Sequence, residues 1–284
     1  MSCSIQKKLH NFSIVLLKIF LQIVILLFAI CVVPPILVVS YFVGKFSKKN
    51  QIKIASAVSF ITWQIFNLIF CLTCTIETKN IPKDNYLVVS NHITAIDFVL
   101  VNNINKHMFS SAKYAFKDSL RVIPVFYQAV LLLKFLVLSR SFEHDRLLIE
   151  KYISDLRKEK LPLWFVLFCE GTRFDEKKKK EADEFCKANG MKPFNNVLCP
   201  RYKGFSIFQQ NLKNSYIKKV LDLTFYCKEG SFSAFDMLLT AKRFNFKLDF
   251  RIVDLNSIED PKQFVEDSFR RKDMIIGRWK EKQN

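Results

Sequence analysis

Residues 86–97 read YLVVSNHITAID, and this short stretch decides how the rest of the chain is interpreted. Its first five residues are mostly apolar and rich in valine, which is typical of a buried β-strand. A polar turn follows, and residues 95–104 predict a helix with Thr94 as its N-cap. A strand followed at once by a helix is the building unit of α/β folds.

The same texture continues from residue 77 to the C-terminus, where short apolar runs alternate with amphipathic stretches. Further strands are expected at residues 131–139, 163–169, 196–199, 220–226 and 247–253, and helices at residues 146–160 and 261–284. The lysine-rich residues 174–192 predict a solvated loop or a frayed helix. The fold class expected for residues 77–284 is therefore α/β.

The first 76 residues have a different composition, with seven lysines, no acidic residue and two long apolar runs at 14–43 and 55–76. About 20 apolar residues suffice to span a bilayer, so we expect residues 1–76 to form a membrane-embedded helical hairpin. Two full spans would put the basic connector 44–50 opposite the rest of the chain, which the positive-inside tendency disfavours. We therefore slightly favour a re-entrant hairpin bent at Pro34-Pro35. A hairpin buried in a protein core is the alternative.

The overall composition excludes several classes of protein. The 284 residues are 50% hydrophobic, too many for a disordered chain, yet they carry a formal net charge of +18. The eight cysteines are too few for a disulfide scaffold, and Cys31, Cys71, Cys169 and Cys199 lie in apolar runs, as buried thiols in a reducing compartment do. The single CxxC ends at Cys74 without a second pair, so zinc is not expected.

His92 is the first candidate for catalysis, because it lies in the turn after the strand at residues 86–90. Asp97 lies in the first turn of the expected helix and can reach back toward the imidazole. A carboxylate on one ring nitrogen orients the ring so that the other nitrogen can take a proton from a hydroxyl. The alternative is structural, since Thr94 and Asp97 also resemble a capping box. That reading leaves Asn91 and His92 unexplained.

A second candidate is Glu170-Gly171-Thr172-Arg173, which directly follows the strand expected at residues 163–169. Gly171 allows a sharp turn, and Thr172, Arg173 and the exposed amides can bind phosphate oxygens. Glu170 could orient Arg173. The alternative is an ordinary turn with a surface ion pair.

Two more arginines also follow expected strands. Arg140 comes after residues 131–139, and Arg201 lies in the segment Cys199-Pro200-Arg201-Tyr202-Lys203-Gly204-Phe205. If the strands are neighbours in one sheet, Arg140, Arg173 and Arg201 converge. Such a site would suit a phosphate-bearing substrate with a hydroxyl to be activated.

Together these motifs resemble those of the glycerolipid acyltransferase family. The family pattern NHxxxxD matches Asn91, His92 and Asp97, EGTR matches residues 170–173, and Pro-Arg followed by Gly-Phe matches residues 200–205. Its arginine block after an apolar strand is similar to residues 138–140, and all four occur in the family's order. The likeness covers about residues 77–226. VLDLT at 220–224, FRRKD at 269–273 and the FSKK connector resemble the eukaryotic branch that includes lysocardiolipin and lysophosphatidylinositol acyltransferases.

The resemblance implies a mixed central sheet flanked by helices, as in glycerol-3-phosphate acyltransferases, and an acyltransferase domain over residues 77–284. The implied reaction transfers a fatty acyl group from acyl-CoA to a free hydroxyl of lysophosphatidic acid or a related lysophospholipid. His92 would be the base and Asp97 would orient it. The substrate-binding residues implied are Asn91, Arg140, Glu170, Gly171, Thr172, Arg173, Pro200 and Arg201. A thioester is already activated, so no metal or cofactor is expected.

The charge supports membrane lipids as partners, because anionic head groups attract basic segments. A nucleic-acid partner is not expected, since no recognition-helix, zinc or aromatic-platform motif accompanies the charge. The resemblance places the chain in the endoplasmic reticulum membrane with its catalytic domain facing the cytosol. The main alternative is a protein of the same fold that binds lysolipid without turnover. A small transporter is disfavoured, because two apolar runs are too few.

Overall fold

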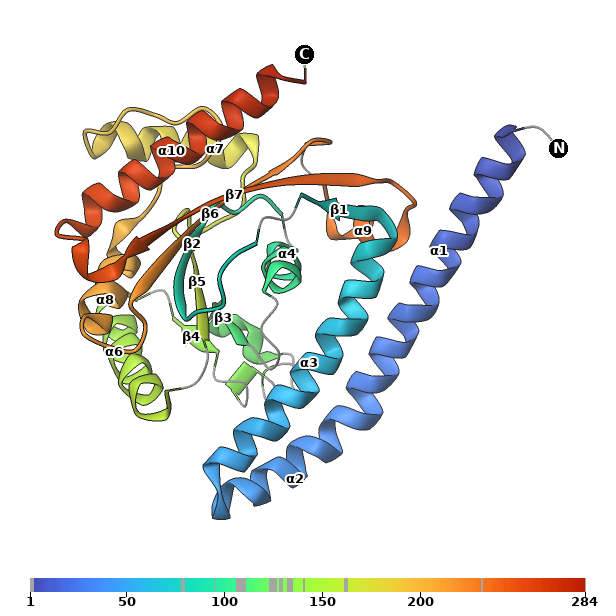
Figure 1. The fold of residues 1–284 in the computed structure, drawn as a ribbon, viewed down its shortest axis with the longest axis horizontal. Helices are drawn as coiled ribbons and strands as arrows, with labels where there is room; N and C mark the ends of the chain where they lie inside the picture. Colours follow the sequence, from blue (N-terminus) through green and yellow to red (C-terminus); the bar gives the residue numbers. More distant parts are fainter. Residues whose placement is uncertain are drawn as a thin grey trace.

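In the part of the chain that the structure describes, a central seven-stranded sheet is covered by helices on both faces (Figure 1). A computed structural model describes residues 3–77, 80–94, 96–105, 111–122, 127, 130–131, 135–139, 141–160, 163–230 and 232–283. The strand order is β1-β7-β6-β2-β5-β3-β4. Neighbouring strands in this order are parallel, except β6 and β7, which are antiparallel. The predicted mixed sheet flanked by helices is thereby confirmed.

The strands are β1 (Cys74–Ile76), β2 (Tyr86–Ser90), β3 (Ser111–Lys117), β4 (Leu136–Leu138), β5 (Leu163–Phe168), β6 (Lys219–Cys227) and β7 (Phe244–Asp254). The short edge strand β1 and the polar β3 were not predicted. The strand expected at 131–139 is limited to β4 in the part that the structure describes. The strand expected at 196–199 is wrong, because the backbone N–H groups of Asn196 and Leu198 donate to the carboxylates of Asp273 and Glu170.

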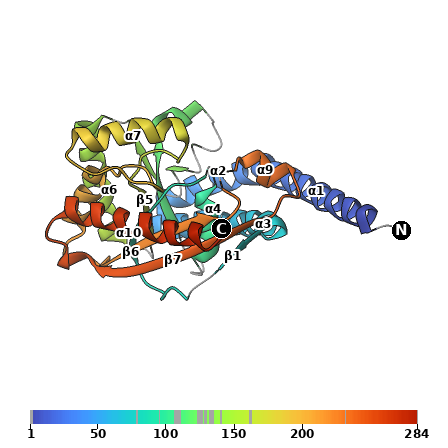
Figure 2. The same ribbon diagram turned by 90° about the horizontal axis from the view of Figure 1, so that it is seen from above.

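Strand β2 lies inside the sheet, and its side chains alternate between two hydrophobic cores. Leu87 and Val89 pack with helices α6 (Phe142–Glu159), α8 (Tyr202–Leu212) and α10 (Pro261–Glu281). Tyr86 and Val88 point to the other face, toward α3 (Lys48–Thr73) and α4 (Asp97–Ile104). All four side chains are fully buried, which is why this stretch is apolar on both faces. Figure 2 shows the helices on the two sides of the sheet.

The lysine-rich segment forms a regular helix, α7 (Glu176–Ala188), and not the loop or frayed helix that its charge suggested. Asp175 caps it by accepting a hydrogen bond from the backbone N–H of Lys178 at 2.9 Å. Near its other end, Cys186 is buried in the hydrophobic core. The predicted helical tail is confirmed as α10, and the short helices are η2 (Asp118–Val122), α9 (Ala234–Leu239) and η3 (Leu255–Ser257).

The N-terminal helices form a hairpin whose turn differs from the predicted one. Helix α1 (Cys3–Leu27), the π-helical η1 (Phe28–Val32) and α2 (Val33–Phe46) follow one another in one direction, and α3 returns beside them (Figure 1). The chain reverses at Ser47, whose hydroxyl caps α3, so the predicted bend at Pro34-Pro35 is wrong. Both prolines lie in the first turn of α2, where a helix tolerates residues without N–H donors.

The hairpin is fixed to the domain by both apolar and polar contacts. The Trp63 ring packs against Phe98 of α4, with ring centroids 5.5 Å apart, and α3 runs directly into β1. Lys18 is fully buried, and its ammonium donates to the Thr73 hydroxyl at 2.9 Å and to carbonyls at the C-terminal end of α9. Gln22, one turn later, donates to another of these carbonyls. The boundary between residues 76 and 77 stays a prediction.

Candidate active site

His92 and Asp97 form the contact that the sequence predicted. His92 Nδ1 lies 2.7 Å from Asp97 Oδ2, and the Asp97 side chain is completely buried whereas that of His92 is 23% exposed. With Asp97 as a carboxylate, Nδ1 carries the proton and donates it, so Nε2 is left as an acceptor. Nε2 makes no hydrogen bond to the described residues. The arrangement therefore has the geometry of an oriented general base.

The turn between β2 and α4 holds the Asp97 carboxylate through its own backbone. The N–H groups of Ile93 and Thr94 donate to it at 2.7 and 3.0 Å, and the Thr94 hydroxyl donates at 2.8 Å. The expected N-cap at Thr94 is wrong, because Ile96 occupies that position and makes no side-chain cap. The Thr94 hydroxyl closes the turn, since it also accepts from the N–H of Ile96.

Asn91 fixes the end of β2 to the neighbouring strand. Its side chain is buried, its amide nitrogen donates to the carbonyl of Phe225 at 2.9 Å, and its amide oxygen accepts from the N–H of the same residue at 2.9 Å. This paired contact sets the position of the following residue, His92. The role of Asn91 in substrate binding stays a prediction.

Glu170 is a buried carboxyl group that joins three loops. It accepts hydrogen bonds from the backbone N–H of His92 and, at 2.8 Å, from that of Leu198. Burial raises the pKa of Glu170 to about 8, although both hydrogen bonds act in the opposite direction. The suggestion that Glu170 orients Arg173 is not what the structure shows, because its carboxylate faces these backbone groups. It connects the EGTR loop to the histidine turn.

Gly171 and Arg201 bring the EGTR and Pro-Arg motifs together. Gly171 has φ of +69°, in the left-handed region that favours glycine, and a Cβ there would lie 3.9 Å from Arg201 Cδ. The N–H of Arg201 donates to the carbonyl of Cys169 at 2.7 Å, and the N–H of Phe174 donates to the carbonyl of His92 at 3.0 Å. Three motifs that are far apart in the sequence therefore meet at one edge of the sheet.

The predicted phosphate-binding residues have different surroundings. Arg173 and Arg201 are both exposed, whereas Thr172 is half-buried and Pro200 is buried. Arg140 lies outside the described residues, so its predicted place in the site stays a prediction. Arg173 lies in the loop after β5, and the backbone N–H of Arg201 donates to the carbonyl of Cys169, just past the end of that strand. The convergence of the three arginines stays a prediction.

Two groups near the site were missed by sequence reasoning. The Phe168 ring stacks on the His92 imidazole with centroids 4.3 Å apart, and Lys178 of α7 donates to the Thr172 hydroxyl at 2.5 Å. Phe168 ends an aromatic strand, and Lys178 belongs to a run of four lysines, so neither stands out by pattern. Of the four cysteines expected to be buried thiols, Cys169 and Cys199 are buried, whereas Cys31 and Cys71 are exposed. Cys199 is paired with Cys186 in a disulfide, so for this residue the expected free thiol is wrong.

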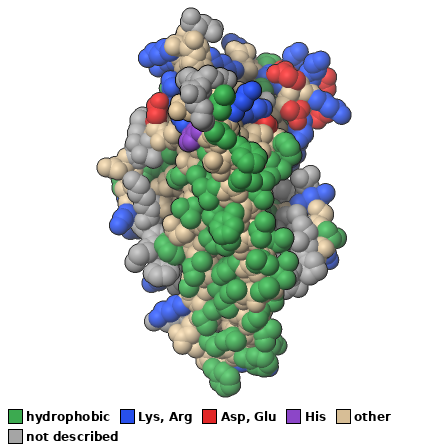
Figure 3. Space-filling model, turned by 90° about the vertical axis from the view of Figure 1, so that its right-hand side faces the viewer, with side chains coloured by type: hydrophobic (Ala, Val, Ile, Leu, Met, Phe, Trp, Pro, Cys, Tyr) green, Lys and Arg blue, Asp and Glu red, His purple; other side chains and the backbone are tan. Residues whose placement is uncertain are grey.

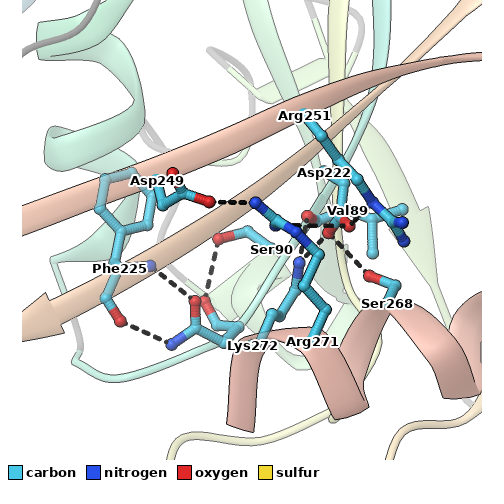
Figure 4. A network of polar contacts seen from close by, with 10 residues as sticks. Val89, Ser90, Asp222, Phe225, Asp249, Arg251, Ser268, Arg271 and Lys272 are labelled. Atoms are coloured by element: carbon cyan, nitrogen blue, oxygen red, sulfur yellow. Dashed lines mark hydrogen bonds and ion pairs between the residues drawn. The ribbon is translucent and has the colours of Figure 1, made fainter. Parts of the chain in front are cut away.

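A buried polar network supports the site from the side of α10 (Figure 4). Lys272 donates to the Asp222 carboxylate of β6 and, at 3.3 Å, to the carbonyl of Val89 in β2. Burial by itself would raise the pKa of Asp222, but Lys272, Ser268 and Arg251 together hold it below its usual value. Asp222 and Lys272 belong to the VLDLT and FRRKD segments, whose proximity the sequence did not indicate.

Comparisons with known proteins show that the chain is similar to acyltransferases. A family model described as Acyltransferase matches residues 71–209. The chain is 29% identical over 201 residues to probable 1-acyl-sn-glycerol-3-phosphate acyltransferase 5 of Arabidopsis thaliana, covering 69% of this chain and 53% of that protein. It is 28% identical over 194 residues to human 1-acyl-sn-glycerol-3-phosphate acyltransferase delta, covering 66% of this chain and 51% of that protein. The chain thus spans about half the length of these curated relatives.

The fold is similar to that of a solved bacterial structure. The crystal structure of the 1-acyl-sn-glycerophosphate (LPA) acyltransferase PlsC from Thermotoga maritima superposes with a TM-score of 0.57 at 17% identity. The match covers 95% of this chain and 97% of that chain, so it includes the N-terminal helices as well as the sheet.

Proposed function

Because the chain belongs to the glycerolipid acyltransferase family, we propose that it transfers a fatty acyl group from acyl-CoA to the free hydroxyl of a lysophospholipid. Lysophosphatidic acid is the first acceptor to test, since the relatives named above carry 1-acyl-sn-glycerol-3-phosphate in their names. The observation that carries the proposal is the contact of His92 Nδ1 with the buried Asp97 carboxylate at 2.7 Å.

In the proposed reaction, Nε2 of His92 accepts the proton of the acceptor hydroxyl while the hydroxyl oxygen attacks the thioester carbonyl. The Asp97 carboxylate stabilises the imidazolium that forms. As the C–S bond breaks, the CoA sulfur takes that proton from His92, which returns the imidazole to its starting state. The products are the acylated lipid and CoA. The chemistry requires no metal or cofactor, because the thioester is already activated.

The loops beside His92 provide a binding place for phosphate. Thr172 and Arg173 follow Glu170, whose carboxylate is bonded to the N–H of His92, and Arg201 packs beside Gly171. An arginine can bind a phosphate through two parallel hydrogen bonds. The acceptor phosphate and its hydroxyl can therefore be held by adjacent loops, with the hydroxyl at the histidine. Arg201 is also available for a phosphate of CoA.

The N-terminal helices support a place at the membrane. The segments Ile5–Phe46 and Lys53–Thr73 are long and apolar enough to cross a bilayer. Figure 3 shows an extended apolar face on the hairpin, and Phe12, Phe20 and Tyr41 each expose about 60% of their surface on α1 and α2. This face would lie in the lipid, with the lysines near anionic head groups. We place the protein at the endoplasmic reticulum membrane with the site facing the cytosol.

The decisive experiment compares the wild-type chain with His92→Ala in lipid vesicles, using acyl-CoA and lysophosphatidic acid. General-base catalysis contributes about 100-fold to 10,000-fold to a reaction rate. The rate of acyl transfer by the variant should therefore fall by at least about 100-fold, while the variant still binds the vesicles. A wild-type protein that binds lysolipid without any turnover would instead support the non-catalytic alternative. Near-normal activity of His92→Ala would refute the assignment of the base.

A further inference from the structure

Helix α7 places a charged side chain next to the EGTR loop, and this side chain has no role in the reaction proposed above. The Lys178 ammonium donates to the Thr172 hydroxyl at 2.5 Å, and its side chain is only 36% exposed. A lysine ammonium has three N–H donors, so it can bind a further acceptor besides Thr172. The Thr172 hydroxyl accepts from Lys178 and can still donate its own proton. Both groups therefore present donors at the same place in the loop.

The position of Lys178 is set by contacts at both ends of α7. At the start, the Asp175 side chain caps the helix by accepting from the N–H of Lys178. Near the end, the buried side chains of Cys186 and Cys199 lie against each other in the hydrophobic core, directly before Pro200-Arg201. The Phe185 ring also lies 5.6 Å from the guanidinium carbon of Arg201. Helix α7 thus connects the EGTR and Pro-Arg loops and holds Lys178 at the first of them.

Lys178 differs from its neighbours in the lysine run. Lys179 is paired with Asp183 one turn later on the same helix, so its charge is compensated. Lys177 and Lys180 are exposed. Asp175 also faces Lys178, but at 3.6 Å and with half of its side chain exposed, so solvent weakens this ion pair. Of the four, Lys178 is the lysine that contacts a residue of the EGTR motif in the described structure.

We propose that Lys178 is a substrate-binding residue whose ammonium binds, together with Thr172 and Arg173, a phosphate group of a substrate. This inference rests on the proposed function, because both substrates of that reaction carry phosphate. The phosphate belongs either to the acceptor lysophospholipid or to CoA, and the chemistry of recognition is the same for both. Lys178 would therefore set the affinity for one substrate and would take no part in proton transfer at His92.

The test uses the full-length chain in vesicles and the variants Lys178→Gln, Lys178→Arg and Lys180→Gln. Loss of a charged hydrogen bond should raise the KM of one substrate roughly tenfold, with a much smaller change in kcat. Lys178→Arg should keep most of the affinity, and Lys180→Gln, which removes an exposed charge from the same run, should match the wild type. A rise in the KM of lysophosphatidic acid identifies the acceptor phosphate, and a rise in that of acyl-CoA identifies CoA.

A second measurement does not depend on turnover. Short-chain lysophosphatidic acid and CoA are each tested for their ability to raise the unfolding temperature of the wild type and of Lys178→Gln. The variant should need roughly tenfold more of one ligand for the same shift. Equal stabilisation of both proteins by both ligands, or unchanged KM values, would overturn the inference. Wild-type protein that is stabilised by ligand but inactive would instead refute the proposed function.

Discussion

Replacing Asp97 by Asn is the sharpest test of how the site is organised, because described residues contact both oxygens of this carboxylate. Oδ2 accepts hydrogen bonds from His92 Nδ1 and from the N–H of Ile93, each at 2.7 Å. Oδ1 accepts hydrogen bonds from the N–H and the hydroxyl of Thr94. An Asn side chain offers one oxygen and one NH2 group in their place. One of the two sites must therefore change from acceptor to donor.

Each orientation of the new amide has a defined consequence. If its NH2 group faces His92, the ring must accept at Nδ1 and carry its proton on Nε2, so the base is lost. If its oxygen faces His92, the ring keeps its tautomer but no carboxylate stabilises the imidazolium. We expect kcat to fall by about 100-fold to 10,000-fold. One backbone N–H of the turn also loses its acceptor, which should cost about 1–3 kcal/mol of unfolding free energy.

The assay measures acyl transfer in vesicles at saturating acyl-CoA, together with thermal unfolding and vesicle binding. Asp155→Asn, at an exposed position on α6, is the matched control for the loss of one carboxylate and should retain full activity. Asp97→Asn should still be folded and membrane-bound. A folded Asp97→Asn protein with near-normal kcat would refute the argument that Asp97 orients His92.

Two further predictions concern stability. Burial raises the pKa of Glu170 from 4.5 to about 8, so between these values the folded state holds a proton that the unfolded state releases. The wild-type unfolding free energy should then fall with rising pH by about 1.4 kcal/mol per unit in this window, whereas Glu170→Gln should lack that contribution. Thermal unfolding of both proteins from pH 5 to pH 8 checks this, and parallel curves would contradict it. Lys18→Met removes the donor shared by Thr73 and the end of α9, and should lower the unfolding free energy by about 1–3 kcal/mol. Lys8→Met, at an exposed site on the same helix, should leave the unfolding temperature unchanged.

The parts of the site that the sequence predicted are those formed within a few residues. His92 and Asp97 lie on one short turn, so their spacing in the chain nearly determines their contact. The left-handed conformation of Gly171 is likewise local. The predicted N-cap at Thr94 failed for the opposite reason, because Thr94 and Asp97 bond to each other and the helix starts later.

Contacts between residues that are far apart in the chain could not be predicted from local sequence patterns. The EGTR motif suggests that Glu170 pairs with the nearby Arg173, yet its carboxylate bonds to Leu198 and His92 of other loops. Residues 196–199 do not form a strand for the same reason. Their backbone N–H groups donate to the side chains of the distant residues Glu170 and Asp273, and are therefore not available to a neighbouring strand. The hairpin turn lies at Ser47 and not at the predicted Pro34-Pro35, because prolines in the first turn of a helix do not reverse the direction of the chain.

The apolar hairpin, the alternation of strands and helices, the order of the motifs and the histidine–carboxylate pair could all be predicted from the amino-acid sequence. Each of these depends on hydrophobic periodicity or on spacing within one turn. Two contacts could be learned only from the folded chain: Lys178, one of four neighbouring lysines, meets Thr172, and Lys272 of α10 lies against Asp222 of β6. Such contacts depend on the order of strands in the sheet and on where each helix packs. The order of the strands is fixed by many contacts between residues far apart in the chain, so it cannot be predicted from a local sequence pattern.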